Sequence, residues 1–151
     1  MRRKRIKHCV LLLVLAGILI LFSAGTGSKS IVSSAISQRT DTMNDYYSGK
    51  MSYKETCVKL AKIETGGILE EDIEALKSFF GTDIEEIVDY EIDEIEINYE
   101  DDDVICAFVS IKWKINGGNG LYRGSEVQNI VGSYSVILEN KENIFKLVQF
   151  C

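Results

Sequence analysis

The stretch that decides the fold is VICAFVSIKWKI, residues 104–115, in which apolar side chains occupy every second position. Such alternation is typical of a β-strand that buries one face, because successive side chains of a strand point to opposite sides. Cys106 and Phe108 make the first half of the second face apolar as well. The stretch therefore predicts a long strand, whose buried face comprises Ile105, Ala107, Val109, Ile111, Trp113 and Ile115.

Three more strands are predicted around this one, because apolar runs with a period of two are separated by polar turns at residues 100–103, 116–120 and 140–143. In the first strand the parity of the apolar residues changes near Asp93 and Glu94, which predicts a β-bulge and a bent strand. Its two apolar sets are Val88, Tyr90 and Ile92, then Ile95, Ile97 and Tyr99. The third strand carries Ile130, Tyr134, Val136 and Leu138, and the last covers residues 144–150.

Three helices are predicted before the strands. The first is expected from about Lys29 to Tyr47, with a stop near Gly49, because its apolar residues recur at helical spacing. Ser52 and Glu55 form a capping-box pattern that opens the second helix. That helix is expected to direct Cys57, Leu60 and Ala61 inward and to end at Gly66 and Gly67.

The third helix is predicted from an apolar stripe and from acidic residues placed favourably in its first turn. It is expected to stop at Gly81, and residues 82–88 could add one short turn. The stripe is Leu69, Ile73, Leu76 and Phe80, and the acids are Glu70, Glu71 and Asp72.

Helices followed by a bent antiparallel meander predict one α+β domain over residues 29–151. This order, with a last strand such as NIFKLV (residues 143–148), resembles the cystatin-like, nuclear-transport-factor-like superfamily of cone-shaped α+β domains. The resemblance implies three helices packed on a curved four-stranded sheet. It also implies an analogy to the outer domains of membrane-anchored bacterial proteins of conjugation and type IV secretion assemblies.

The first 28 residues predict a membrane anchor. Five cations within residues 2–7 precede an uncharged run over residues 9–28, which places the basic end in the cytoplasm and the domain outside. The dense apolar core, residues 9–22, also has the length of a signal peptide, and Ser23, Ala24 and Gly25 could form a cleavage site. Two locations follow: a single-pass protein of a bacterial cytoplasmic membrane, or a secreted domain after cleavage.

The charge and the residue types of the exported part exclude several functions. All 23 acidic residues and only 12 of the 17 basic ones follow the apolar run, so the domain carries a net charge near −11 and is not expected to bind nucleic acid. The only histidine, His8, precedes the run, so the domain can build neither a Ser-His-Asp nor a Cys-His pair. No phosphate-binding or dinucleotide-binding glycine motif occurs, and we expect neither a cofactor nor catalysis.

Twelve acids and no basic residue lie between Asp83 and Asp103. One interpretation is a weak cation site at Asp101, Asp102 and Asp103, although their spacing is not that of an EF-hand. Another is a solvated sheet face with a charged, protected edge. The third is a surface for a basic protein partner, and its candidate residues are Glu91, Asp93, Glu94 and Glu96.

Aromatic and cysteine residues leave further alternatives open. Cys57 is predicted to reach either Cys106 or Cys151 if any disulfide forms. Cys106 and Cys151 are expected on strands flanking the neighbourhood of Val131, about 9.6 Å apart, which is too far for a bridge. Five aromatic residues are predicted either to line a ligand-binding cone or to fill the core: Trp113, Tyr122, Tyr134, Phe108 and Phe145.

The favoured functional hypothesis is a non-catalytic, membrane-anchored extracytoplasmic interaction module within an envelope assembly. The first alternative is a small-molecule or lipid-binding cone. The second is an enzyme that uses a buried carboxylate, which would need an acid whose pKa is raised by burial.

Overall fold

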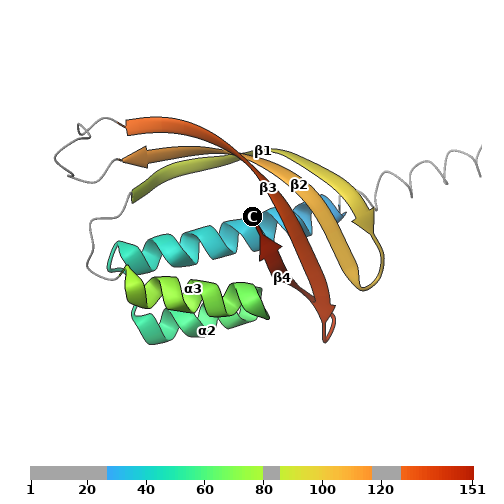
Figure 1. Cartoon of the computed structure of the whole chain (residues 1–151), viewed down its shortest axis with the longest axis horizontal. Coiled ribbons are helices and arrows are strands. Elements are labelled where there is room, and N and C mark those ends of the chain that lie inside the picture. The colour runs from blue at the N-terminus through green and yellow to red at the C-terminus, as the bar shows by residue number, and fades with distance from the viewer. Residues whose placement is uncertain (1–26, 80–85, 117–126) are drawn as a thin grey trace, which may run out of the picture.

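The computed structural model of the chain describes residues 27–79, 86–116 and 127–151. Three helices precede a four-stranded antiparallel sheet, so the predicted α+β class is confirmed. The curved sheet lies over the N-terminal helix, and the other two helices lie on the far side of that helix (Figure 1). Within the described ranges no helix is both long and apolar enough to cross a bilayer, and the predicted anchor lies almost wholly outside them.

The N-terminal helix covers residues 27–47, and Gly49 follows it with a φ of 75°, as predicted. Its inward stripe, with Val32 and Ile36 almost fully buried, packs against the sheet. Further along, Tyr46 is buried in a second cluster with Leu60 and Leu76 of the other helices. One helix therefore joins two hydrophobic cores.

Helix α2 (Tyr53–Ile63) begins at the predicted capping box. The Glu55 N–H donates to Ser52 Oγ, and the Ser52 N–H donates back to Glu55 Oε2 at 3.1 Å. Leu60 is buried as predicted and Cys57 is half-buried, but Ala61 is exposed. The other buried residues of α2 are Thr56 and Ile63.

The predicted end of α2 at Gly66 and Gly67 is wrong. The helix ends at Ile63, because Glu64 adopts an extended backbone and forms a parallel bridge with Leu147 of the last strand. Gly66, with a φ of 69°, is instead the N-cap of helix α3 (Gly67–Ser78). These two glycines open a helix rather than close one.

Helix α3 follows its predicted stripe only in part. Leu76 is buried and Leu69 and Ile73 are half-buried, while Ile68 and Asp72 are buried on the same side. The helix ends at Ser78, before the predicted stop, and residues 80–85 lie outside the description. The short turn expected over residues 82–88 is wrong for residues 86–88, which already belong to the first strand.

The strands are β1 (Glu86–Glu100), β2 (Val104–Asn116), β3 (Val127–Lys141) and β4 (Ile144–Phe150), paired in that order. The turns predicted after β1 and after β3 are confirmed. In the second of these, Glu142 and Asn143 both have positive φ, as a two-residue hairpin turn requires. The turn predicted between β2 and β3 lies outside the described residues apart from Asn116.

Strand β1 is bent by three register shifts against β2. The shift between Ile92 and Glu94 is the predicted bulge. The other two follow Ile87 and Ile97, and they turn Val88 and Tyr99 to solvent, with 51% and 54% of their surface exposed. The prediction that Val88 shares a face with Tyr90, and Tyr99 with Ile97, is therefore wrong, since each lies beside a further bulge.

Strand β2 buries the predicted face, and its first four inward residues are almost inaccessible. On its other face Phe108 is 56% exposed. In β3, Val136 and Leu138 are buried as predicted, but Ile130 remains 43% exposed. The main core beneath the sheet consists of Val32, Ala35, Ile36, Ile68, Ile105, Ala107, Val109, Ile111, Val136, Leu138 and Leu147.

Candidate functional site

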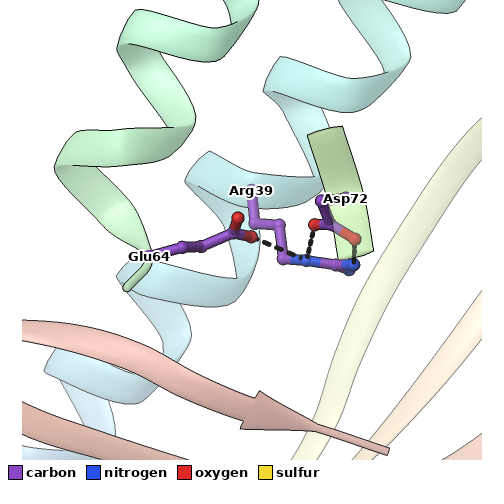
Figure 2. A network of polar contacts seen from close by, with 3 residues as sticks. All are labelled: Arg39, Glu64 and Asp72. Atoms are coloured by element: carbon purple, nitrogen blue, oxygen red, sulfur yellow. Dashed lines mark hydrogen bonds and ion pairs between the residues drawn. The ribbon is translucent and has the colours of Figure 1, made fainter. Parts of the chain in front are cut away.

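A buried polar network lies where the three helices meet the last strand. Arg39 comes from the N-terminal helix, Asp72 from α3 and Glu64 from the connection between α2 and α3 (Figure 2). Arg39 follows Ile36 by three positions and Val32 by seven, so its helix directs it inward with the apolar stripe. Chain segments far apart in the sequence thus bring one cation to two carboxyl groups.

The guanidinium of Arg39 makes its hydrogen bonds to Asp72. Nε donates to Oδ2 at 2.8 Å and Nη2 donates to Oδ1 at 2.7 Å, which is the bidentate geometry that strengthens such pairs. The same Nε lies 2.9 Å from Oε1 of Glu64, whose side chain is fully buried. Neither oxygen of Glu64 has a hydrogen-bond partner among the described residues, because the N–H of Nε is directed at Asp72.

Burial, followed by the charge of Asp72, raises the pKa of Glu64 from its ordinary value of 4.5 to about 8. Arg39 opposes these effects without cancelling them. A single guanidinium neutralises one carboxylate, and a second buried anion would remain uncompensated. The surroundings of Glu64 therefore favour its neutral form.

Local sequence patterns did not predict this network. The one available signal was Arg39, a charged residue within an apolar stripe of helical spacing. Glu64, followed by Thr65 and two glycines, had the pattern of an exposed helix end. Its burial depends on the bridge to Leu147, 83 positions later in the chain, which local patterns do not reveal.

The aromatic residues form a row across the sheet instead of an open cone. Tyr90 of β1 contacts Trp113 of β2, whose Nε1 donates to Tyr134 Oη of β3 at 2.8 Å. The Tyr134 ring stacks on Phe150 of β4 with centroids 4.6 Å apart, and Arg39 lies 5.0 Å from the centroid of the Phe150 ring. We call these four aromatic residues the aromatic row.

The five aromatic residues predicted as ligand contacts are not brought together. Trp113 and Tyr134 belong to the aromatic row, and Phe145 packs against the edge of the main core. Phe108 lies on the opposite face of the sheet, since its parity in β2 is that of the outward residues, and it is 56% exposed. Tyr122 lies outside the described residues. Phe108 therefore cannot line one pocket together with Trp113 and Tyr134.

The residues predicted to bind a partner lie together on β1, which is an outer strand of the sheet. Glu91, Asp93, Glu94 and Glu96 are all exposed. Lys112 of β2 forms ion pairs with Asp93 and, at 3.8 Å, with Glu91. Glu94 and Glu96 have no cationic partner within the described part of the chain. We call these four residues, with Lys112, the acidic edge.

Asp101 of the weak candidate cation site (Asp101, Asp102 and Asp103) forms hydrogen bonds within the turn after β1. The Asp101 carboxylate accepts hydrogen bonds from Tyr99 Oη, the Asp103 N–H and the Val104 N–H. The bond from Tyr99, with the two backbone bonds, lowers the pKa of Asp101. Among the residues described, no three His, Cys, Asp or Glu side chains are placed to hold a metal ion.

The cysteines lie apart from these features. Cys57, Cys106 and Cys151 are free thiols in the structure. Cys106 pairs with Ile137, and the Cys151 backbone pairs with Ser135. The two cysteines therefore flank β3 near Ser135 and Ile137, whereas the prediction placed them near Val131. Their placement on opposite sides of β3 is confirmed.

Three shallow hollows mark the surface of the described ranges. One of about 240 Å³ lies beside Tyr90 and Trp113, and one of about 430 Å³ lies between the N-terminal helix and the start of β4. The third, about 720 Å³, lies over α2 near Lys54 and Val58. Glu64 lines none of the three.

No protein-family model matches the chain, and no curated protein matches its sequence significantly. Among solved structures, the chain is similar to the intermembrane space region of the chloroplast protein ARC6. The two share 8% identity with a TM-score of 0.40 over 75% of this chain and 89% of that one. A likeness at this level carries no inference about function, and membership in the cone-shaped superfamily stays a prediction.

Proposed function

We propose that the chain is a non-catalytic, membrane-anchored interaction module whose domain operates outside a bacterial cytoplasmic membrane. The basic residues at positions 2–7, followed by the uncharged run over residues 9–28, support this orientation. In the alternative, cleavage of that segment releases the same domain. The module would serve as one subunit of an envelope assembly, such as a conjugation or secretion apparatus.

The observation that carries the proposal is the position of Phe108 beside the acidic edge. Phe108 is 56% exposed and stands opposite Glu96 in the β1–β2 register, on the face turned away from the helices. Large aromatic side chains of this kind are enriched at protein interfaces. With Glu94 and Glu96 alongside, the surface suits an arginine of a partner, which can pair with a carboxylate and stack on a ring.

The alternatives have weaker support. Glu64 has the raised pKa that a catalytic acid would need, yet its side chain is fully buried and lines none of the three hollows described above. A ligand-binding cone would need open aromatic side chains, but Trp113 and Tyr134 are engaged with each other. The hollow beside them, about 240 Å³, is smaller than the roughly 300–1,000 Å³ of typical ligand pockets.

The binding surface is tested by affinity capture with the full-length chain, tagged at its C-terminus and solubilised from membranes. We expect the double variant Glu94→Lys/Glu96→Lys and the variant Phe108→Ser to lose at least about tenfold of the captured partner. Glu70→Lys/Glu71→Lys is the matched control, because it changes the charge equally at exposed positions of α3. Equal capture by all variants, or no partner for the native chain, would contradict the proposal.

The orientation is tested separately with intact cells. An external protease should remove the C-terminal tag without lysis, because the domain lies outside. Protection of the tag until the membrane is broken would show that the domain faces the cytoplasm.

A further inference from the structure

The connection between α2 and α3 is attached to the last strand of the sheet. Glu64 bridges to Leu147, and the Thr65 N–H donates to the Leu147 carbonyl at 3.0 Å. Lys146 Nζ donates to the carbonyl of Ala61 at 2.6 Å. These contacts, all within five residues of the chain, hold the end of the helical hairpin on β4.

Neither carboxyl oxygen of Glu64 accepts a well-aligned hydrogen bond from the described residues, although Arg39 Nε lies 2.9 Å from Oε1. Both donors of Arg39 that reach the network are used by Asp72. A carboxylate that has neither a donor nor solvent is costly in the interior, whereas the protonated group carries no charge. The docked arrangement therefore suits the neutral form of Glu64.

The charged and titratable groups around Glu64 come from every element that packs against it. Arg39 and Tyr47 lie on the N-terminal helix and Asp72 lies on α3, and the pKa of Tyr47 is raised by burial and then by Asp72. On β4, Lys146 is committed to the Ala61 carbonyl, and Lys62 at the end of α2 is exposed. Among the described residues, only Arg39 lies within ion-pair distance of Glu64, and Asp72 already neutralises it.

We propose that Glu64 is a protonation-dependent clasp: the α2–α3 hairpin stays docked on β4 and the N-terminal helix while Glu64 holds its proton, and opens more readily when the proton is lost to solvent. Leu60 and Leu76 of the hairpin share a small core with Tyr46 of the N-terminal helix, and Ile68 is the one hairpin residue in the larger core beneath the sheet. Opening can therefore be local, with the sheet left intact.

The pH range follows from the raised pKa of about 8 in the docked state. An opened hairpin exposes Glu64, whose carboxyl then ionises near its ordinary value of 4.5. The free energy of opening falls as pH rises above 4.5, and it becomes constant above about pH 8. Acid therefore closes the clasp and mild alkali loosens it.

The test measures the accessibility of Cys57, which packs against the small core of the hairpin. In a full-length chain with the other three cysteines changed to serine, Cys57 is the only thiol. Its rate of modification is compared between the native Glu64 and Glu64→Gln, because the shared rise in thiolate with pH cancels in the ratio. We expect the ratio of native to variant rate to increase by at least about tenfold from pH 6 to pH 8.5, while the fluorescence of Trp113 stays unchanged.

A second variant separates the clasp from a general loosening. Asp72→Asn leaves Glu64 as the only carboxylate facing Arg39, so an ionised Glu64 becomes paired and the increase between pH 6 and pH 8.5 should disappear. Parallel rates for the native chain and Glu64→Gln would overturn the proposal. So would a Glu64→Gln chain that is open or unfolded at pH 6, since a neutral amide should maintain docking.

Discussion

The indole Nε1 of Trp113 donates a hydrogen bond to the hydroxyl oxygen of Tyr134 at 2.8 Å, joining β2 to β3 beneath the sheet. The bond fixes the position of the Tyr134 ring, which in turn stacks on Phe150. At the two ends of the aromatic row, Tyr90 Oη donates to Asp41 at 3.0 Å, and Phe150 contacts Arg39. The row thus holds the N-terminal helix against all four strands.

Replacing Tyr134 with phenylalanine should lower the free energy of unfolding by about 1 kcal/mol, because the ring stays but the half-buried indole N–H loses its acceptor. Chemical denaturation followed by the fluorescence of Trp113 measures the change. Tyr53→Phe is the control, because Tyr53 is exposed, and it should have no effect. Equal stability of the two variants would show that the bond contributes nothing.

Replacing Gly132 with alanine should destabilise the domain by about 1–3 kcal/mol, although alanine is usually tolerated in strands. A Cβ at this position would collide with the hydroxyl and ring of Tyr134, which lies over its own strand neighbour. Calorimetric unfolding measures the loss. The loss should shrink in a Tyr134→Ala background, because the clash is removed; an unchanged loss would assign it to another cause.

Replacing Glu64 with glutamine should stabilise the domain at pH 8 by on the order of 4 kcal/mol and leave it unchanged near pH 4. The native pKa is raised from 4.5 to about 8, so the folded state holds a proton that the unfolded state releases. The contribution of Glu64 to the free energy of unfolding is therefore fully present below pH 4.5, and it is lost as pH rises to about 8. Urea unfolding at a series of pH values measures the difference.

Glu74→Gln serves as the control for that pH series, because Glu74 is an exposed glutamate in the middle of α3. Its unfolding curve should follow the native one at every pH. The predicted sign would be wrong if the stability of the native chain relative to Glu64→Gln were higher at pH 8 than at pH 5.

Replacing Ser52 with alanine should cost about 1 kcal/mol, because the capping box at the start of α2 loses its side-chain acceptor. Circular dichroism during thermal unfolding measures the lower midpoint. Ser30→Ala is the comparison at an exposed position of the N-terminal helix, where alanine should be neutral or slightly stabilising. A Ser52→Ala chain as stable as the native one would mean that α2 does not depend on its cap.

The sequence was sufficient for the order of the elements and for the buried face of β2. Alternation over residues 104–115 is strict, and the strand buries the predicted side chains. Only one of the three bulges in β1 was predictable, because only the bulge at Asp93 changes the parity of the apolar residues. At Val88 and Tyr99 the apolar pattern continues through the bulge, so nothing in the composition indicates that these side chains turn outward.

The buried network was beyond the reach of local patterns. Arg39 and Asp72 lie 33 positions apart, and Glu64 is buried by a bridge to a strand near the end of the chain. By contrast, the acids of β1 were predictable as an exposed group, because no basic residue lies among them. The parity of Phe108 in β2 correctly placed it on the second face, so it could not join Trp113 and Tyr134 around one pocket.

The bulges in β1 also limit the addition of further strands at this edge of the sheet. Between its register shifts the strand keeps a regular pleat only over residues 89–92 and 94–97, four residues each. A second chain that paired with the free edge of β1 would meet no regular segment longer than four residues. Its backbone hydrogen bonds to β1 would therefore be interrupted at each bulge. The domain can thus display a long outer strand at high local concentration without seeding fibres.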